Sequence, residues 1–330
     1  MNVAVVFTDV FPEALHPQIA AAAPTGWTYR VAADPSPEGM LRLTREADVI
    51  FSGATGTTDE ILCAARRLTF VQKLGAGVDS INLELCRQRG IGVANLPGNN
   101  AVAAAEHAVM LMLAVYRHLA ELDRVVRSGG WVGEERRAVH RELRGKTVGL
   151  VGFGNIGRAV AKRVRAFEAD VIYHDLQPGA DEATAVRVTL PELLERSDIV
   201  SLHLPLLPET TGIVDRRWLA SMKPGSVLIN CARGGLVNEA DLVDALTSGR
   251  LYGAGLDCFA GEYAGGSAGL WSAPNLVLSP HVAGASVENF ETMLSRAFGN
   301  ARSYLAGEPL SHGGAIVDPV PRRLDLIGRR

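Results

Sequence analysis

The stretch "KTVGLVGFGNIGRAVAKRV", residues 146–164, constrains the fold more than any other part of the sequence. An apolar strand pattern runs directly into Gly152-x-Gly154-x-x-Gly157, and a helix pattern follows. Glycines at this spacing permit a tight turn and let the backbone approach a pyrophosphate, whose charge meets the N-terminus of the helix. Such a motif alone is weak evidence, but here the strand precedes it and the helix follows it. The sequence therefore predicts a dinucleotide-binding α/β domain.

The next predicted strand lies in "DVIYHD" and ends in Asp175. An acidic side chain at this place accepts hydrogen bonds from the adenine ribose hydroxyls and repels a 2′-phosphate. The three residues that follow, "LQP", contain no arginine, which favours NAD over NADP. The alternative is a glycine-rich turn followed by a solvated aspartate.

Short apolar runs alternate with helix-like segments along most of the chain, which is typical of parallel α/β sheets. The runs "DIVSLHLPL" and "YGAGLDCF" lack period-two alternation, as central parallel strands do. Strands are predicted at 2–7, 27–31, 48–52, 70–74 and 92–95, and in a second series at 147–151, 170–174, 199–204, 226–230, 253–257 and 276–279. Helices are predicted in the first series at 59–68 and 82–90.

Composition argues against several classes of protein. The 330 residues carry 33 Lys and Arg against 36 Asp and Glu, a net charge of −3, so no nucleic-acid partner is expected. The first residues form a strand-like run without a positive segment, and the longest apolar stretch contains Glu106 and His107, so no signal peptide and no membrane span are predicted. The four cysteines show no ligand-like spacing, which predicts free thiols, a cytoplasmic protein and no metal site.

One long helix is predicted from Ala101 to about Ser128, where "SGGW" breaks it. Its central "AVMLMLAV" is apolar nearly all round, so we expect it to be buried between domains or at a subunit interface. Another helix, at about 287–305, has no following strand of its own domain, and we expect it to return to the first domain. The poorly patterned tail "HGGAIVDPVPRRLDLIGRR" is expected on the surface or on a partner.

Polar residues gather where four predicted strands of the second series end, at the edge where open α/β sheets bind ligands. The segments are "HLPLLPETTG", "NCARGG", "LDCFAGE" and "SPHVAG". Taken singly, Arg233, Glu262 and His281 have ordinary explanations as a surface ion-pair partner, a loop carboxylate and a loop histidine. Together they place an arginine, a carboxylate and a histidine beside the dinucleotide motif.

With these motifs the chain resembles the D-isomer-specific 2-hydroxyacid dehydrogenases from about residue 45 to 307. Matching pieces include "LGAGVDSIN", "LRGKTVGLVGFGNIG", "INCARGGLVNEADLV", "GAGLDCFAGE" and "LVLSPHVAGAS". The resemblance implies a Rossmann-type doubly wound parallel sheet for NAD, residues 99–285, inserted into a smaller flavodoxin-like α/β substrate domain, residues 1–98 plus 286–330. It also implies an active site in the cleft, a homodimer built mainly by the nucleotide domain, and D stereochemistry.

The resemblance carries a catalytic triad onto Arg233, Glu262 and His281. Histidine titrates near working pH, so His281 would exchange a proton with the substrate oxygen as hydride passes between the nicotinamide and the substrate carbon. Glu262 would orient the ring and favour its charged form. Arg233 would hold the substrate carboxylate with two parallel hydrogen bonds and polarise the neighbouring carbonyl.

Further positions follow the family pattern. Ala76 and Gly77 would offer backbone N–H groups to the substrate carboxylate, and Asp257 would accept from the nicotinamide carboxamide. Cys231 fits better as a small packing residue than as a redox group. The residues that would contact NAD are Gly152, Gly154, Asn155, Ile156, Gly157, Asp175, Pro205, Thr210, Cys231, Ala232, Asp257, Ala283 and Gly284.

The substrate is less constrained. Relatives acting on phosphoglycerate commonly carry an arginine in the loop that here reads "FSGATGTTDE", with Ser52 at the corresponding point. Phosphite-oxidising relatives carry a lysine where this chain has Ala76. Lys73, three residues earlier, is interpreted either as a substrate contact or as a solvated strand-end lysine. A small 2-oxo acid such as glyoxylate or hydroxypyruvate is the main expectation.

Two alternatives remain open. After Glu262 the family usually continues with proline, whereas this chain continues with Tyr263 and "AGGSAG". This departure, together with Lys73, allows a phosphonate or another specialised acid of a biosynthetic pathway as substrate. The second alternative is an NAD(H)-sensing, corepressor-like binding protein, since some relatives use the same fold in that way.

Overall fold

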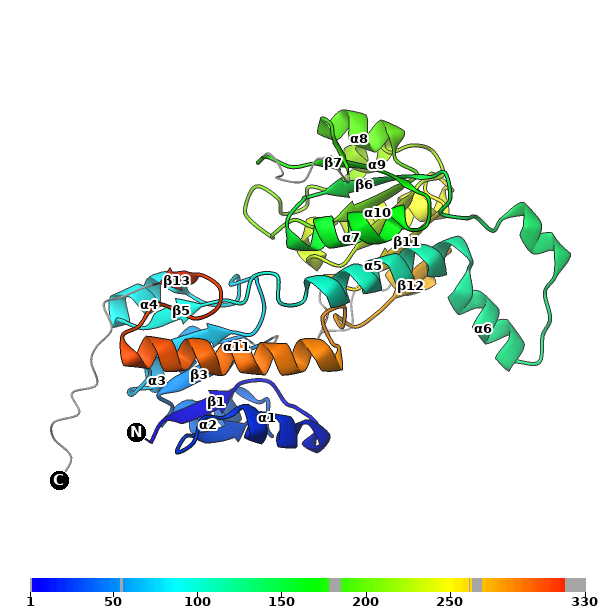
Figure 1. Cartoon of the computed structure of the whole chain (residues 1–330). Helices are drawn as coiled ribbons and strands as arrows, with labels where there is room; N and C mark the ends of the chain where they lie inside the picture. Colours follow the sequence, from blue (N-terminus) through cyan, green and yellow to red (C-terminus); the bar gives the residue numbers. More distant parts are fainter. Residues whose placement is uncertain (1, 54–55, 178–184, 261, 263–268, 318–330) are drawn as a thin grey trace, which may run out of the picture. The chain divides into compact units, whose positions relative to one another are not determined.

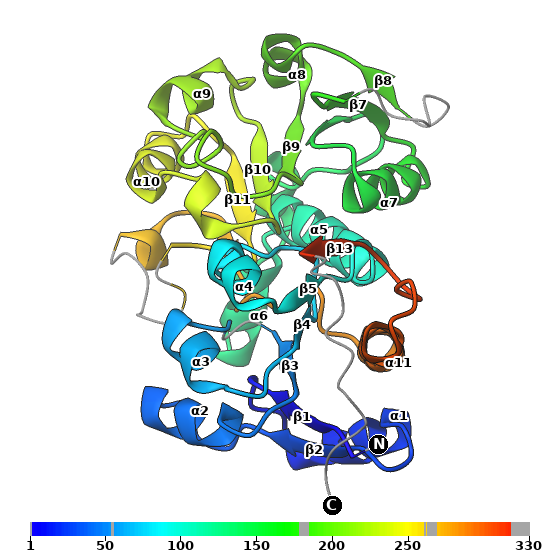
Figure 2. The same cartoon turned by 90° about the vertical axis from the view of Figure 1, so that its left-hand side faces the viewer.

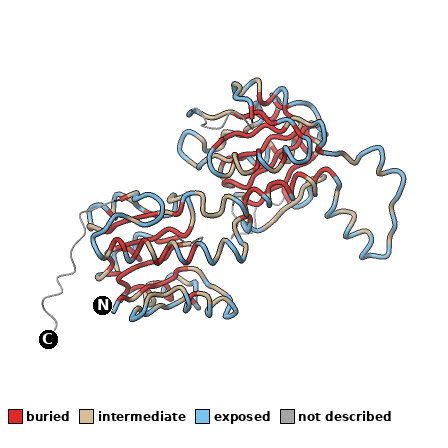
Figure 3. The backbone as a smooth tube through the Cα atoms, viewed as in Figure 1, coloured by how far each residue is buried: buried red, intermediate tan, exposed pale blue. Residues whose placement is uncertain are grey.

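The computed structural model describes residues 2–53, 56–177, 185–260, 262 and 269–317. The chain forms two compact units, Met1–Asn100 with Ser286–Arg330 and Ala101–Ala285 (Figure 1). In both units the buried residues follow the strands (Figure 3). Tyr263 and the glycine-rich stretch after it, up to residue 268, lie outside the described residues, as does the tail beyond Val317. Among the helices that are described, none combines the length and apolar character needed to cross a membrane.

The first unit contains a six-stranded sheet in the order β13-β5-β4-β3-β1-β2. The five strands β1 to β5 are parallel and follow the order of a flavodoxin-like sheet, as the resemblance implies. The strands are β1 Ala4–Phe7, β2 Thr28–Val31, β3 Val49–Ser52, β4 Phe70–Lys73, β5 Gly92–Ala94 and β13 Ala315–Val317. The helices are η1 Glu13–Leu15, α1 His16–Ala22, α2 Pro37–Thr44, α3 Asp59–Ala64, α4 Leu83–Arg89 and α11 Val287–Ala306.

Two hydrophobic layers hold this sheet. Helices α2, α3 and α4 cover one face, and α1 and α11 cover the other (Figure 2). Helix α11 confirms the expected return to the first domain: Phe298 packs edge-on against Phe7 and Phe51, and Tyr304 stacks on Phe70 at 4.5 Å between ring centroids. Because α11 supplies so much of this layer, the N-terminal strands depend on residues near the other end of the chain.

The tail forms more structure than its pattern predicts. β13 pairs antiparallel with β5, and the backbone N–H of His312 donates to Asn300 Oδ1 at 2.8 Å. The strand is only three residues long and irregular in register. Its short apolar run, "AIV", gave too little periodicity to be recognised.

The second unit contains a seven-stranded parallel sheet in the order β12-β11-β10-β9-β6-β7-β8, the doubly wound arrangement that the sequence predicts. The strands are β6 Thr147–Val151, β7 Asp170–His174, β8 Val186–Arg187, β9 Ile199–Leu202, β10 Val227–Asn230, β11 Gly253–Leu256 and β12 Leu276–Leu278. The helices are α5 Ala101–Tyr116, α6 Leu119–Arg127, η2 Glu134–Ala138, α7 Asn155–Arg165, α8 Leu190–Arg196, α9 Arg216–Ser221, η3 Gly234–Leu236, α10 Glu239–Thr247 and η4 Leu270–Ser272.

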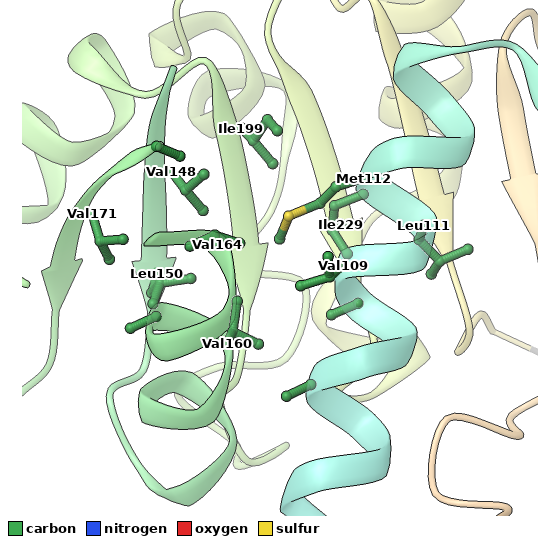
Figure 4. Packing of buried hydrophobic residues seen from close by; sticks show 14 of the residues in the cluster. Val109, Leu111, Met112, Val148, Leu150, Val160, Val164, Val171, Ile199 and Ile229 are labelled. Carbon is green, nitrogen blue, oxygen red and sulfur yellow. The ribbon is translucent and has the colours of Figure 1, made fainter. Parts of the chain in front are cut away.

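Helices cover both faces of this sheet. Leu111 and Met112 of α5 and Val160 and Val164 of α7 pack against strand residues such as Ile229 (Figure 4). On the other face, α8, α9 and α10 bury a second apolar cluster. The central strands β9, β10 and β11 are buried throughout, which explains their continuous apolar runs.

The prediction of one helix from Ala101 to about Ser128 is wrong. The helix ends at Tyr116, and α6 begins at Leu119 after His118, whose φ of 52° is left-handed. That conformation costs a non-glycine residue about 1–2 kcal/mol. The His118 ring offsets the cost by contacting the hydroxyl of Tyr252 at 2.8 Å and the carboxylate of Glu121 at 3.3 Å. Tyr252 is distant in sequence, so no local pattern predicted the break.

Candidate active site

The glycine turn after β6 forms a space that suits a pyrophosphate. Gly152 has a φ of 97°, and a Cβ there would lie 2.4 Å from the carbonyl oxygen of His203. A Cβ at Gly157 would lie 2.4 Å from the carbonyl oxygen of Gly152. At Gly154, which precedes α7, no described heavy atom lies within 4 Å of the Cβ position. Two glycines therefore let the turn pack closely, and the third leaves open space at the N-terminus of α7.

The Asp175 carboxylate lies beside this turn. It accepts hydrogen bonds from the backbone N–H groups of Phe153 at 2.7 Å and Gln177 at 2.9 Å. An arginine is nevertheless near: Arg187 of β8 donates to the carbonyl oxygen of Asp175 at 2.9 Å. The three residues after Asp175 gave no indication of Arg187. This arginine lies twelve residues further along the chain, and the parallel pairing of β7 with β8 brings it beside Asp175.

The sheet edge continues at the end of β10. The Asn230 side chain donates to the carbonyl oxygen of Arg233 at 2.9 Å and accepts from the N–H of Ala232 at 3.0 Å, so it fixes the turn that includes Cys231. The Arg233 guanidinium donates to the Ala232 carbonyl oxygen at 2.7 Å. A Cβ at Gly234 would lie 2.2 Å from the backbone of Phe259. Glycine therefore allows the Arg233 turn to lie directly on the loop after β11.

Glu262 and His281 form a close pair of titratable groups at this edge. His281 Nδ1 lies 2.7 Å from Glu262 Oε2, and the other carboxylate oxygen accepts from the N–H of Phe259 at 3.2 Å. His281 has a left-handed φ of 54°, and its own N–H donates to the carbonyl oxygen of Asp257 at 2.8 Å. The carboxylate therefore fixes the ring through Nδ1, and Nε2 is the nitrogen that faces away from Glu262.

Asp257 anchors the loop that carries His281. Its Oδ1 accepts from the Ser279 hydroxyl at 2.6 Å and the Val282 N–H at 3.0 Å, and its Oδ2 accepts from the Ala283 N–H at 2.8 Å. Burial favours a raised pKa for this carboxyl, but hydrogen bonds from His107, Ser279, Val282 and Ala283 outweigh it and lower the pKa to about 2. A carboxylate has about four acceptor positions, so Oδ2 retains one for another donor.

His107 of α5 completes this network, which sequence reasoning missed. Its Nε2 lies 2.7 Å from the Ser279 hydroxyl and 3.3 Å from Asp257 Oδ1. The only signal was a polar pair, Glu106 and His107, inside an otherwise apolar helix pattern.

The remaining predicted cofactor positions lie around the same edge. Thr210 donates to the carbonyl oxygen of Pro205 at 2.8 Å and accepts from the N–H of Leu207 at 2.8 Å, which closes the loop after β9. Asn155 and Ile156 form the first turn of α7, and Ala283 and Gly284 follow the loop of His281.

Of the predicted substrate residues, Ser52, Lys73, Ala76 and Gly77 lie in the first unit and Arg233 lies in the second. Ser52 and Lys73 are neighbours in register at the ends of β3 and β4. Lys73 is only 8% exposed and donates to the carbonyl oxygen of Gly53 and, at 3.1 Å, to the hydroxyl of Ser80. It is therefore not a solvated strand-end lysine. The Asn95 side chain donates to the carbonyl oxygen of Ala76 at 2.6 Å, next to Gly77.

The chain is similar in sequence and in structure to known dehydrogenases. The family profile described as "D-isomer specific 2-hydroxyacid dehydrogenase, NAD binding domain" matches residues 109–283. The D-3-phosphoglycerate dehydrogenase of Mycobacterium tuberculosis is 36% identical over 324 residues, 95% of this chain, but this chain spans only 60% of that protein's length. The glyoxylate reductase of Thermofilum pendens is 38% identical and matches over 83% of both chains. The NAD complex of NAD-dependent formate dehydrogenase from Staphylococcus aureus superposes with a TM-score of 0.84, at 28% identity, over 97% of this chain and all of that one.

Proposed function

Because the chain belongs to the D-isomer specific 2-hydroxyacid dehydrogenase family, we propose that it interconverts a small 2-oxo acid and the corresponding D-2-hydroxy acid with NAD as its cofactor. One observation carries the proposal: the 2.7 Å contact between Glu262 Oε2 and His281 Nδ1 at the sheet edge, in the unit that also contains the glycine turn. This pair can exchange a proton where the family binds NAD.

The residues of the second unit suit NAD. The open space at Gly154 and the N-terminus of α7 would take the pyrophosphate, and Asp175 would take the adenine ribose. When bound, NAD accepts or supplies the hydride. We assign the cofactor to residues 99–285 and the substrate loops to residues 1–98 plus 286–330.

His281 is proposed as the acid and base. Glu262 accepts a hydrogen bond from Nδ1–H, which holds the ring in one orientation and leaves Nε2 for the substrate oxygen. In reduction, Nε2 donates its proton to the forming hydroxyl. In oxidation, neutral Nε2 accepts that proton, and the Glu262 carboxylate stabilises the resulting imidazolium.

Arg233 is proposed to hold the substrate carboxylate. A guanidinium presents two parallel N–H donors that match a carboxylate, and its charge also polarises the carbonyl next to it. The turn beneath it is fixed by Asn230 and by the close packing of Gly234 on the neighbouring loop. The arginine is therefore oriented before substrate arrives, which lowers the cost of binding.

A small acid is the proposed substrate, although several relatives are named D-3-phosphoglycerate dehydrogenases. The loop that begins at Ser52 has no basic residue, and Lys73 is bonded to Gly53 and Ser80 within the first unit. We infer that Lys73 positions the loop containing Ala76 and Gly77, whose backbone N–H groups would meet the carboxylate. A distal phosphate would thus lack a basic partner among these described residues.

The test is NADH oxidation across a panel of 2-oxo acids, each with and without a distal phosphate or phosphonate. We expect turnover of glyoxylate or hydroxypyruvate and little gain from a phosphate. Activity confined to the phosphorylated or phosphonate members would contradict the small-acid proposal and favour the specialised substrate. Tight NADH binding without turnover of any member would favour a sensor.

The preference for NADH over NADPH is expected to depend on Asp175. In Asp175→Asn the amide oxygen can still accept from Phe153, but the charge that repels a 2′-phosphate is gone. Hydrogen bonds to charged groups contribute about 1.5–3 kcal/mol, so kcat/KM with NADH should fall by roughly 10- to 100-fold while activity with NADPH rises. Arg187 should supply the partner of the 2′-phosphate, so the double variant with Arg187→Ala should lose the NADPH gain. Retention of the gain in the double variant would exclude Arg187 from this role.

We propose a homodimer built through the second unit. Met110 of α5, Leu119 and Val126 of α6, and Trp131 beyond α6 are exposed apolar side chains, and Trp131 is 87% exposed. Figure 1 shows α6 and the segment after it extending away from the sheet of this unit. Light scattering should give twice the chain mass for the wild type and for Phe167→Asp, a matched exposed apolar site at the end of α7. It should give a lower mass for the double variant Leu119→Asp, Trp131→Asp. An unchanged mass would place the interface elsewhere.

We also propose that the protein works in the cytoplasm. All four cysteines are free thiols, and Cys231 and Cys258 lie close to the proposed active site. A reducing compartment keeps such thiols reduced.

A further inference from the structure

A third potential metal ligand lies beside the Glu262–His281 pair. Cys258 follows β11, and one ligand atom each from Cys258, Glu262 and His281 all lie within 4.8 Å of one another. Thiolate sulfur, imidazole nitrogen and carboxylate oxygen are the donors that Zn²⁺ takes from proteins. We propose that these three side chains form a Zn²⁺ site, and that zinc held there inhibits the dehydrogenase. Zinc binding stands apart from the proposed function, whereas the inhibition rests on it.

The geometry requires only small movements. Zn–S is about 2.3 Å and Zn–N and Zn–O are about 2.0–2.2 Å, so tetrahedral donors lie roughly 3.3–3.7 Å apart. The distances from the sulfur to the other two donors would therefore shorten by roughly 1.1–1.5 Å at most, while the 2.7 Å gap between Nδ1 and Oε2 would open as the metal replaces the proton there. The Glu262 and His281 side chains are 18% and 36% exposed, so their rotation can supply part of this movement.

The site has a closed side and an open side. Cys258 is 1% exposed and its thiol contacts the carbonyl oxygen of Ala232 at 3.6 Å. The more exposed histidine and glutamate leave a way in from solvent. Three protein ligands with a fourth position open to water or substrate is the arrangement of accessible zinc sites, whereas closed structural sites use four protein ligands.

The charges also suit a divalent cation. Burial raises the pKa of the Cys258 thiol strongly and the carboxylates of Glu262 and Asp257 raise it further, whereas the Arg233 guanidinium lowers it. The net shift is upward, so without metal the thiol is neutral. Zinc binding releases the thiol proton, and the thiolate and the Glu262 carboxylate then match the two charges of the metal. Mg²⁺ and Ca²⁺ prefer oxygen ligands and gain little from sulfur.

Zinc would inhibit the enzyme because it would bind Nδ1 of His281. An imidazolium needs a proton on both ring nitrogens. A metal on Nδ1 occupies one of them, so His281 cannot form the acid that the proposed reduction uses. The spacing of the cysteines gave no indication of this site, because only one of the three ligands is a cysteine. The ligands come from the ends of β11 and β12 and from the loop between these strands.

The first experiment titrates Co²⁺ into the NAD-free protein and records its optical spectrum. Wild type and Cys63→Ser, a matched exposed cysteine in the first unit, should each show a sulfur-to-cobalt charge-transfer band that saturates at one equivalent. Cys258→Ser, which keeps a hydrogen-bond donor for Ala232 but removes the soft ligand, should lose the band. Retention of the band in Cys258→Ser would overturn the site.

The second experiment measures Zn²⁺ inhibition of NADH oxidation. Mutation of a residue that only hydrogen-bonds to a zinc ligand typically lowers zinc affinity 10- to 100-fold. Because Cys258 is proposed as a ligand itself, Cys258→Ser should raise the half-inhibitory Zn²⁺ concentration by at least roughly that factor. Mg²⁺ should not inhibit, and a chelator should restore wild-type activity. Equal inhibition of wild type and Cys258→Ser would contradict the proposal.

Two further outcomes remain decisive. If Cys258→Ser does not fold, as judged by circular dichroism, X-ray absorption of zinc-loaded Cys63→Ser should show one sulfur at about 2.3 Å, and its absence would overturn the site. If no 2-oxo acid is turned over but the cobalt band depends on Cys258, the metal site stands and the proposed function fails.

Discussion

Replacing His281 with alanine is expected to lower kcat/KM for 2-oxo acid reduction by roughly 10²- to 10⁴-fold, the usual contribution of a positioned general acid. The KM for NADH should change little, because the glycine turn and Asp175 do not contact the ring. The left-handed φ of 54° could confound the alanine variant. Asparagine tolerates that conformation better than alanine, so His281→Asn should show the same loss with less effect on stability. Steady-state kinetics of both variants against a confirmed substrate provide the measurement.

The control for this prediction is a histidine away from the sheet edge. His312 belongs to the first unit, near Asn300, and His312→Ala should keep nearly full activity. A loss of no more than a few-fold in both His281 variants would mean that another group exchanges the proton.

Arg233→Lys is expected to lose roughly 10²- to 10³-fold in kcat/KM, which is the cost of removing one preorganised donor to a developing oxyanion. Lysine keeps the charge but is a point donor, so it cannot make two parallel hydrogen bonds to a carboxylate. The loss should appear in both KM and kcat, because the guanidinium is proposed to bind the carboxylate and to polarise the carbonyl. Guanidinium ion added to Arg233→Ala should restore part of the activity.

The matched control is an arginine on the surface of the same unit. Arg196 of α8 makes an ion pair with Glu192, four residues away, and is half exposed. Arg196→Lys should change activity by less than twofold, because exposed pairs of this kind contribute little. If Arg233→Lys retained its affinity for the acid and lost only turnover, the carboxylate would have to bind elsewhere.

Much of the fold was predictable because its signals are local. The strand, the glycine turn and the helix of the nucleotide motif adjoin one another in sequence, and the apolar runs of the parallel sheets are recognisable by themselves, with the exception of β8, two exposed residues that were not predicted as a strand. The same holds for Arg233, Glu262 and His281, which each follow a strand. Parallel strands bring such residues to one edge, so their arrangement follows from the topology.

The features that were missed depend on contacts between distant segments. Arg187 reaches Asp175 only because β8 pairs with β7, and His118 bends its helix because Tyr252 lies beside it. His107 joins Asp257 from another element, and Lys73 is buried because two loops close over it. Periodicity and propensity carry no information about such partners.

The insertion of one unit into the other has a consequence for biosynthesis. During translation the strands carrying Phe7, Phe51 and Phe70 emerge first, but the helix that covers them, α11, emerges only after residues 101–285 have been made. The inserted unit contains all its own strands and can complete its core earlier. The nascent chain therefore carries this aromatic sheet face covered only in part, by α1, for most of its synthesis. Such a surface is the kind that chaperones bind and that aggregates when translation stalls.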